Sequence, residues 1–135
     1  MVTVDTSVVV AVLSGWHEHH ENALAAVDGV DRLPAHVLLE SSSVLTRLPG
    51  GLARPLPEVV AALRMSFGGP LLTLPGPKHQ ALLEALAEAG LAGGAVYDGL
   101  IAATAHHHRA RLLTLDRRAI PIYRALGVDV IRLTD

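Results

Sequence analysis

The chain has 135 residues, a formal net charge of −2 at pH 7 and no cysteine, and 50% of its residues are hydrophobic. This composition is typical of one well-packed globular domain, and it excludes a disordered chain, a disulfide scaffold and a zinc–thiolate site. No apolar run approaches the ~18 residues of a membrane span and the N-terminus has no basic leader, so we expect a cytoplasmic protein that does not contact membranes.

The apolar pattern predicts strands alternating with helices along the chain. Residues 1–6 alternate and are β-branched, which predicts a strand ending at Asp5 or Thr6. A valine-rich run follows at 7–14, then a helix over 17–29 and an extended piece near 31–34. We expect further helices over 35–48, 57–67 and 77–90, with a strand at 71–74. A helix containing Asp98, a strand over 111–115, a helix over 116–127 and a strand over 128–133 complete the prediction.

This order predicts an α/β fold with a mainly parallel sheet, built as a single domain over residues 1–135. In open α/β sheets, ligands bind beyond the carboxyl ends of the strands. Asp5 ends the first predicted strand and Asp116 follows the strand over 111–115, so both are expected at that edge.

Four carboxylates have no easy surface explanation. Asp5, Asp98 and Asp116 each lie beside apolar residues, and each taken alone is a natural helix N-cap. Glu40 is internal to its predicted helix, with valines on the same face. Three independent caps and an internal glutamate have no structural reason to lie at one end of a sheet, so we expect the four residues to form one site.

Clustered carboxylates repel one another, and at neutral pH they share protons or hold cations. An oxygen-only ligand set without cysteine favours Mg²⁺ or Mn²⁺. Such ions generate hydroxide and clamp a phosphoryl group for in-line displacement. The acidic residues therefore predict metal-dependent phosphoryl chemistry.

Four motifs in this order resemble PIN domains, and within them the VapC toxins of bacterial toxin–antitoxin modules. They are "VDTSVVVAVL", a glutamate after "VLL" near position 40, "YDGLIAATA" and "LLTLDRRA" followed by "YRALGVDVIRL". The likeness covers nearly the whole chain, and it implies a three-layer α/β/α sandwich with ribonuclease activity. The family's acidic quartet falls on Asp5, Glu40, Asp98 and Asp116, and its accessory hydroxyl positions fall on Ser7 and Thr114.

The resemblance implies that Asp5, Asp98 and Asp116 bind Mg²⁺ or Mn²⁺ directly. Glu40 would bind the ion through water or orient the attacking water, and the two hydroxyl residues would fix carboxylate rotamers. The implied products of RNA cleavage carry 5′-phosphate and 3′-hydroxyl ends.

The resemblance also implies partners. VapC proteins commonly dimerise, and each is silenced by an antitoxin whose helix covers an apolar groove. An isolated acidic domain with scattered arginines offers RNA little continuous positive surface, so we expect a homodimer with Arg117 and Arg118 near the RNA. Trp16 is a candidate residue of the antitoxin groove.

Three alternatives stay open. A phospho-acceptor receiver domain has a similar size and order of elements, but it needs a lysine after a late strand, and the single lysine, Lys78, precedes a helix. A catalytically silent PIN domain that binds RNA or protein is opposed by the intact quartet. A PIN nuclease of RNA processing would differ from a toxin in lacking a neighbouring antitoxin gene.

Overall fold

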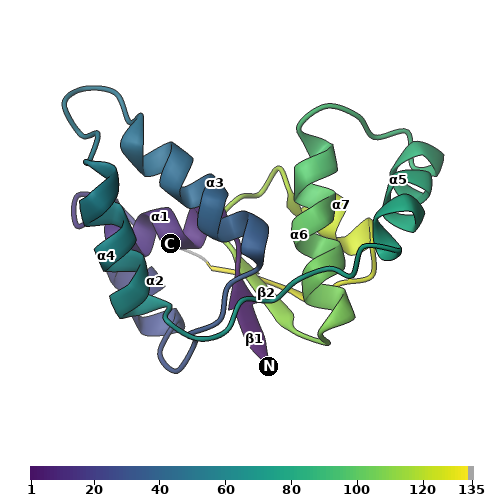
Figure 1. The fold of residues 1–135 in the computed structure, drawn as a ribbon, viewed down its shortest axis with the longest axis horizontal. Coiled ribbons are helices and arrows are strands. Elements are labelled where there is room, and N and C mark those ends of the chain that lie inside the picture. Colours follow the sequence, from purple (N-terminus) through teal and green to yellow (C-terminus); the bar gives the residue numbers. More distant parts are fainter. Residues whose placement is uncertain (134–135) are drawn as a thin grey trace.

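The computed structural model describes residues 1–133, so the last two residues of the predicted 1–135 domain lie outside the described part. Within it, β1 (Val2–Val4), β2 (Arg111–Thr114) and β3 (Val130–Arg132) form one parallel sheet in the order β1-β2-β3. Helices α1 to α4 lie on one side of the sheet and α5 to α7 on the other (Figure 1). This arrangement confirms the predicted α/β class and the parallel sheet, whose faces helices must cover.

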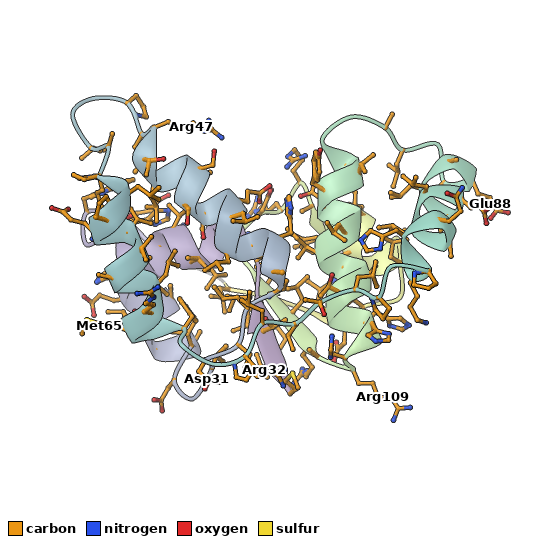
Figure 2. The ribbon with its side chains drawn as sticks, viewed as in Figure 1. Asp31, Arg32, Arg47, Met65, Glu88 and Arg109 are labelled. Carbon is orange, nitrogen blue, oxygen red and sulfur yellow. The ribbon has the colours of Figure 1, made fainter. Side chains whose placement is uncertain are left out.

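Four helices follow β1: α1 (Thr6–Leu13), α2 (His20–Ala26), α3 (Ala35–Thr46) and α4 (Leu56–Ser66). The helices predicted over 35–48 and 57–67 agree closely with α3 and α4. Helix α2 is shorter than the predicted 17–29, because a turn precedes it. Figure 2 shows Arg47, just after α3, and Met65, on α4, pointing away from the sheet.

Helix α1 forms from the valine-rich run, although β-branched residues favour strands. Val8, Val9 and Val12 are buried in the core, so tertiary packing stabilises the helix and outweighs the local preference of valine for strands. Asp5 caps the helix, since its side chain accepts a hydrogen bond from the Val8 amide.

Helices α5 (Lys78–Glu88), α6 (Ala95–His107) and α7 (Ile120–Ala125) cover the other side of the sheet. Gly99 allows α5 and α6 to pack closely, because a Cβ at this position would lie 2.9 Å from Leu86 Cδ2. Helix α7 is shorter than the predicted 116–127, because Asp116 starts a turn in which its carbonyl accepts from the Ala119 amide at 3.2 Å.

The predicted strand at 71–74 is wrong, and so is the regular alternation of strands and helices. In the described residues, β1 and β2 are separated by helices alone. Leu72 forms only an isolated bridge with Pro34. Pro70 and Pro75 flank the segment, and proline cannot donate a ladder hydrogen bond, so the pairing does not extend.

The parallel register determines where the candidate site lies. Val4 pairs with Leu113, and the Asp5 amide donates to the Leu113 carbonyl at 3.1 Å, so β1 and β2 end side by side. Buried residues of α1, α3 and α6 join the same hydrophobic core as these strands. Within residues 1–133, no helix combines the length and apolar character needed to span a membrane.

Candidate active site

Asp5 directly follows β1 and is only 2% exposed. Its Oδ1 accepts from the Ser7 hydroxyl at 2.5 Å and, at 3.4 Å, from the Val8 amide. Its Oδ2 accepts from the Thr114 hydroxyl at 2.5 Å and from the Tyr123 hydroxyl at 2.8 Å. Burial raises the pKa of Asp5, and these donors oppose the rise because they stabilise the ionised form. The carboxylate is therefore buried but fully hydrogen-bonded.

The hydroxyls of Ser7 and Thr114 also connect Asp5 to the turn after β2. Ser7 Oγ accepts from the Leu115 amide at 2.9 Å, and Thr114 Oγ1 accepts from the Asp116 amide at 2.9 Å. Each hydroxyl thus donates to Asp5 and accepts from the backbone beside Asp116. This network couples the position of Asp5 to that of Asp116.

Three of the predicted acids line one cleft of about 680 Å³. Glu40 comes from α3, Asp98 from the first turn of α6, and Asp116 from the turn after β2. Asp5 is outside the lining and lies behind Ser7, which is part of it. The structure therefore brings three of the four acids to a common surface, with the fourth buried beside it.

Asp98 occupies an apolar helix face, and its side chain is 15% exposed. It does not cap α6, whose N-cap is Gly94. Burial raises the pKa of Asp98; Arg118 opposes the rise, and the nearby charges of Asp116 and Glu40 add to it. Glu40 and Asp116 are thus close enough to raise the pKa of Asp98.

Arg118 supplies a positive charge to this acidic cleft. Its Nη2 lies 3.2 Å from Asp116 Oδ2 and 3.6 Å from Asp98 Oδ2. Asp116 Oδ1 also accepts from the Arg118 amide at 3.0 Å, so Asp116 caps a turn and not a helix. The Arg118 side chain is 70% exposed, and such pairs are weak. Arg117, the other predicted RNA contact, is exposed and lies outside the cleft lining.

Glu40 has contacts that sequence reasoning missed. Its Oε1 accepts from the Thr6 hydroxyl at 2.5 Å, and its Oε2 lies 3.3 Å from His36 Nε2, one turn earlier on α3. The His36 ring stacks on Tyr97 with the ring centroids 5.0 Å apart. The four-residue spacing of His36 and Glu40 is a signal that could have revealed this pair. No local pattern signals the bond between Tyr123 and Asp5, which are 118 residues apart.

The donor chemistry of the cleft fits a hard divalent cation, because Glu40, Asp98 and Asp116 offer only oxygen ligands. Among residues 1–133, no three acidic or histidine side chains converge closely enough to coordinate one ion in the present arrangement. Asp98 and Asp116 instead lie beside the guanidinium of Arg118, whose positive charge occupies the place of a metal ion. A cation bound to these carboxylates would compete with Arg118 for the same oxygens.

Residues 2–125 match the model of the PIN domain. The chain is 41% identical over 130 residues to Ribonuclease VapC40 of Mycobacterium tuberculosis, a match that covers 96% of this chain and 97% of that protein. It is 39% identical over 131 residues to Ribonuclease VapC27 of the same species, covering 96% and 95%. The chain belongs to the PIN-domain family. Its curated relatives within that family are VapC ribonucleases, so the predicted resemblance is confirmed.

Solved structures agree with this assignment at the level of the fold. Mycobacterium tuberculosis VapC20, described as a toxin that cleaves the sarcin–ricin loop, has a TM-score of 0.72 and 20% identity, with 95% of this chain and 96% of that chain covered. VapBC2 of Rickettsia felis, bound to a promoter DNA fragment, has a TM-score of 0.71 and 16% identity, with 99% and 100% covered. These similarities confirm the predicted PIN-like fold.

Proposed function

We propose that this protein is a metal-dependent ribonuclease that acts as the toxin of a VapBC toxin–antitoxin system. One observation carries the proposal: Glu40, Asp98 and Asp116 line a single cleft in a chain that is similar to VapC ribonucleases over almost its full length. Its site of action is the cytoplasm, a reducing compartment that suits a chain without cysteine.

The proposed ion is Mg²⁺ or Mn²⁺, held by Asp5, Asp98 and Asp116; when bound, it activates water and stabilises the charge that develops on the phosphoryl oxygens. Oδ1 of Asp5 is its less tightly bonded oxygen, because it accepts from Ser7 at 2.5 Å and from the Val8 amide only at 3.4 Å, whereas Oδ2 accepts from two hydroxyls at 2.5 and 2.8 Å. The hydrogen bonds that Asp5 accepts from Ser7 and Thr114 fix its orientation.

Glu40 orients the attacking water in this proposal, and its contacts with Thr6 and His36 hold the carboxylate in place. The water oxygen forms a bond to phosphorus as the bond from phosphorus to the 3′ oxygen breaks. The attacking water gives up one proton to the solvent and the leaving 3′ oxygen takes one from it, so the products are a 5′-phosphate and a 3′-hydroxyl.

Arg117 and Arg118 are proposed to contact RNA phosphates, and Arg118 becomes available when a metal ion replaces it beside Asp98 and Asp116. Each phosphate contact makes RNA affinity depend on salt, so replacing either arginine with alanine is expected to flatten the salt slope by roughly one unit. The proposed homodimer aligns these residues from two copies, and light scattering at micromolar concentration measures its mass.

The proposed antitoxin covers an apolar hollow of about 480 Å³ between α3 and α4. Its lining includes Leu38, Leu39, Leu56, Val60, Leu63 and Phe67. Leu39 is largely exposed, which favours an apolar helix as its cover. Trp16 is not among the lining residues, so the hollow gives no support to its predicted role in the groove. An antitoxin gene beside this one would favour the toxin over a nuclease of RNA processing.

The test is cleavage of a structured RNA by the purified protein. Wild type is expected to cleave with Mg²⁺ or Mn²⁺ and to stop when EDTA is added. Asp5→Asn, Glu40→Gln and Asp116→Asn are each expected to reduce the rate by orders of magnitude while circular dichroism shows a retained fold. Glu18→Gln is the matched control, because Glu18 lines the cleft but is outside the quartet, and it is expected to keep its activity. Failure of wild type to cleave with either metal would overturn the proposal, and a fully active Glu40→Gln would make Glu40 structural.

A further inference from the structure

We propose that Tyr97 is a stacking platform for an unpaired RNA base and that it positions the attached phosphate at the carboxylates of the cleft. The inference rests on the proposed function and specifies how that site binds its substrate. Tyr97 is a positioning residue in this proposal, because it binds a base and does not touch the reacting atoms.

The ring of Tyr97 is held in place by a neighbouring ring on one side. Tyr97 lies in the first turn of α6 and lines the acidic cleft, and it is 55% exposed. The His36 ring is stacked on it with an interplanar angle of 2°. His36 is itself held 3.3 Å from Glu40 Oε2. A ring that is already oriented loses little side-chain entropy when a ligand stacks on it.

The distribution of aromatic residues singles out Tyr97. The chain has one tryptophan, two tyrosines and one phenylalanine. Phe67 and Tyr123 are buried, so neither is free to stack on a ligand. Trp16 is 53% exposed but lies outside the cleft lining. Tyr97 is the aromatic residue that is both exposed and part of this lining.

The charge of the cleft favours stacking as a source of affinity. Glu18, Glu40, Asp98 and Asp116 all line it, and Arg118 is already paired with two of these acids. Arg118 is the one arginine or lysine among the described residues of this lining, so backbone phosphates find a single guanidinium there even when a metal ion releases it. Stacking on an aromatic ring needs no charge and contributes binding for any base with an open face. The substrate class that fits is a single-stranded or looped segment, because the neighbours in a duplex cover the faces of a paired base.

The position of Tyr97 next to Asp98 connects base binding to the chemistry. The two residues are consecutive on α6, and Asp98 is one of the acids proposed to hold the metal. A base stacked on Tyr97 keeps its own sugar and phosphate within the same cleft. Tyr97 then contributes to substrate affinity, while the acids determine the rate of hydrolysis.

The first test separates KM from kcat on a single-stranded oligoribonucleotide with Mn²⁺ present. Tyr97→Leu is expected to raise KM about tenfold, the size typical of one base–aromatic stack, with kcat within about twofold of wild type. Tyr97→Phe keeps the ring and is expected to behave as wild type. Trp16→Leu is the matched control, because it removes an exposed aromatic residue outside the cleft, and its KM is expected to stay unchanged.

The second test detects stacking directly in the Asp116→Asn background, with 2-aminopurine placed at each position of the oligoribonucleotide in turn. Binding is expected to quench the fluorescence at one position, and Tyr97→Leu is expected to remove that quenching. Suppose that wild type cleaves RNA. If Tyr97→Leu then has the KM and the quenching of wild type, or loses kcat alone, the stacking platform is wrong and the proposed function stands. An equal rise in KM for Trp16→Leu would also overturn the platform. If wild type neither cleaves nor binds RNA, both proposals fall.

Discussion

Asp98 shares a helix face with Ile101, Ala102 and Ala105, which are all buried, so its charge opposes folding. Burial is the largest cause of its raised pKa, and Arg118 offsets only part of the effect. An arrangement that opposes folding but concentrates negative charge in a cleft is typical of a functional site. We therefore propose that Asp98 serves the chemistry of the protein more than its stability.

A stability measurement tests this interpretation. Because the pKa of Asp98 in the folded protein lies above its ordinary value of 3.8, the folded state binds the proton more tightly than the unfolded state. The wild type consequently loses stability as pH rises through the folded pKa of Asp98, and Asp98→Asn lacks this contribution. In EDTA, calorimetry is expected to show that Asp98→Asn melts above wild type at neutral pH and that the difference disappears below about pH 3.8.

Glu88→Gln is the control for that measurement, since Glu88 is an exposed acid at the end of α5, outside the cleft lining and at the edge of the molecule in Figure 2. Its melting temperature is expected to follow wild type at every pH. A neutral-pH melting temperature for Asp98→Asn at or below that of wild type would show that the Asp98 charge does not oppose folding.

The candidate site was predictable from the sequence to different extents for different residues. The acids were identifiable because a carboxylate beside "LLTL" or within "AVYDGLIAATA" has no ordinary surface role. The donors that hold them were not, because Tyr123 reaches Asp5 only through the packing of α7, and Thr6 reaches Glu40 only through the packing of α1 on α3. Such contacts depend on the tertiary fold, and no local period encodes them.

Among the elements, the turn from Asp116 to Ala119 distinguishes this site. It replaces the expected first turn of α7 and directs Arg118 toward Asp98 and Asp116. The guanidinium thereby lowers the repulsion between the two acids when no metal is bound. Arg118 consequently competes with a divalent ion for the same carboxylates.

This competition predicts that Arg118→Ala binds Mn²⁺ more tightly than wild type. The gain is expected to be roughly twofold to fivefold, the size of one exposed ion pair, and isothermal titration calorimetry measures it. Arg117→Ala is the matched control, because Arg117 carries the same charge but lies outside the cleft lining, and its affinity is expected to match wild type. Weaker binding by Arg118→Ala would mean that the guanidinium assists the metal site.

The elements themselves were predictable where local signals were strong. Helices α3, α4 and α5 match their predicted spans because apolar stripes and flanking proline or glycine mark them. Helix α1 was not assignable, because its valines favour a strand until core burial and the Asp5 cap stabilise the helix. The segment at 71–74 is the opposite case. Its apolar residues predict a strand, but the flanking prolines prevent the pairing from extending beyond one bridge.

At the scale of the whole molecule, α3 connects the two surfaces proposed to bind partners. Its Glu40 and Val44 line the acidic cleft, and its Leu38 and Leu39 line the apolar hollow. A helix seated in the hollow would therefore contact the same element that carries a catalytic candidate. This arrangement gives an antitoxin a physical route to the site without requiring a change in the sheet.

Expression in a bacterial host tests the central claim, that the acidic cleft makes this protein an RNA-cleaving toxin. Wild type and Asp98→Asn are expressed to equal protein levels. Growth and RNA fragments with new 5′-phosphate ends are measured in the same cultures. Wild type is expected to arrest growth and produce such fragments, and Asp98→Asn is expected to do neither. Growth arrest and fragments at the wild-type level from Asp98→Asn, or neither effect from wild type, would contradict the account.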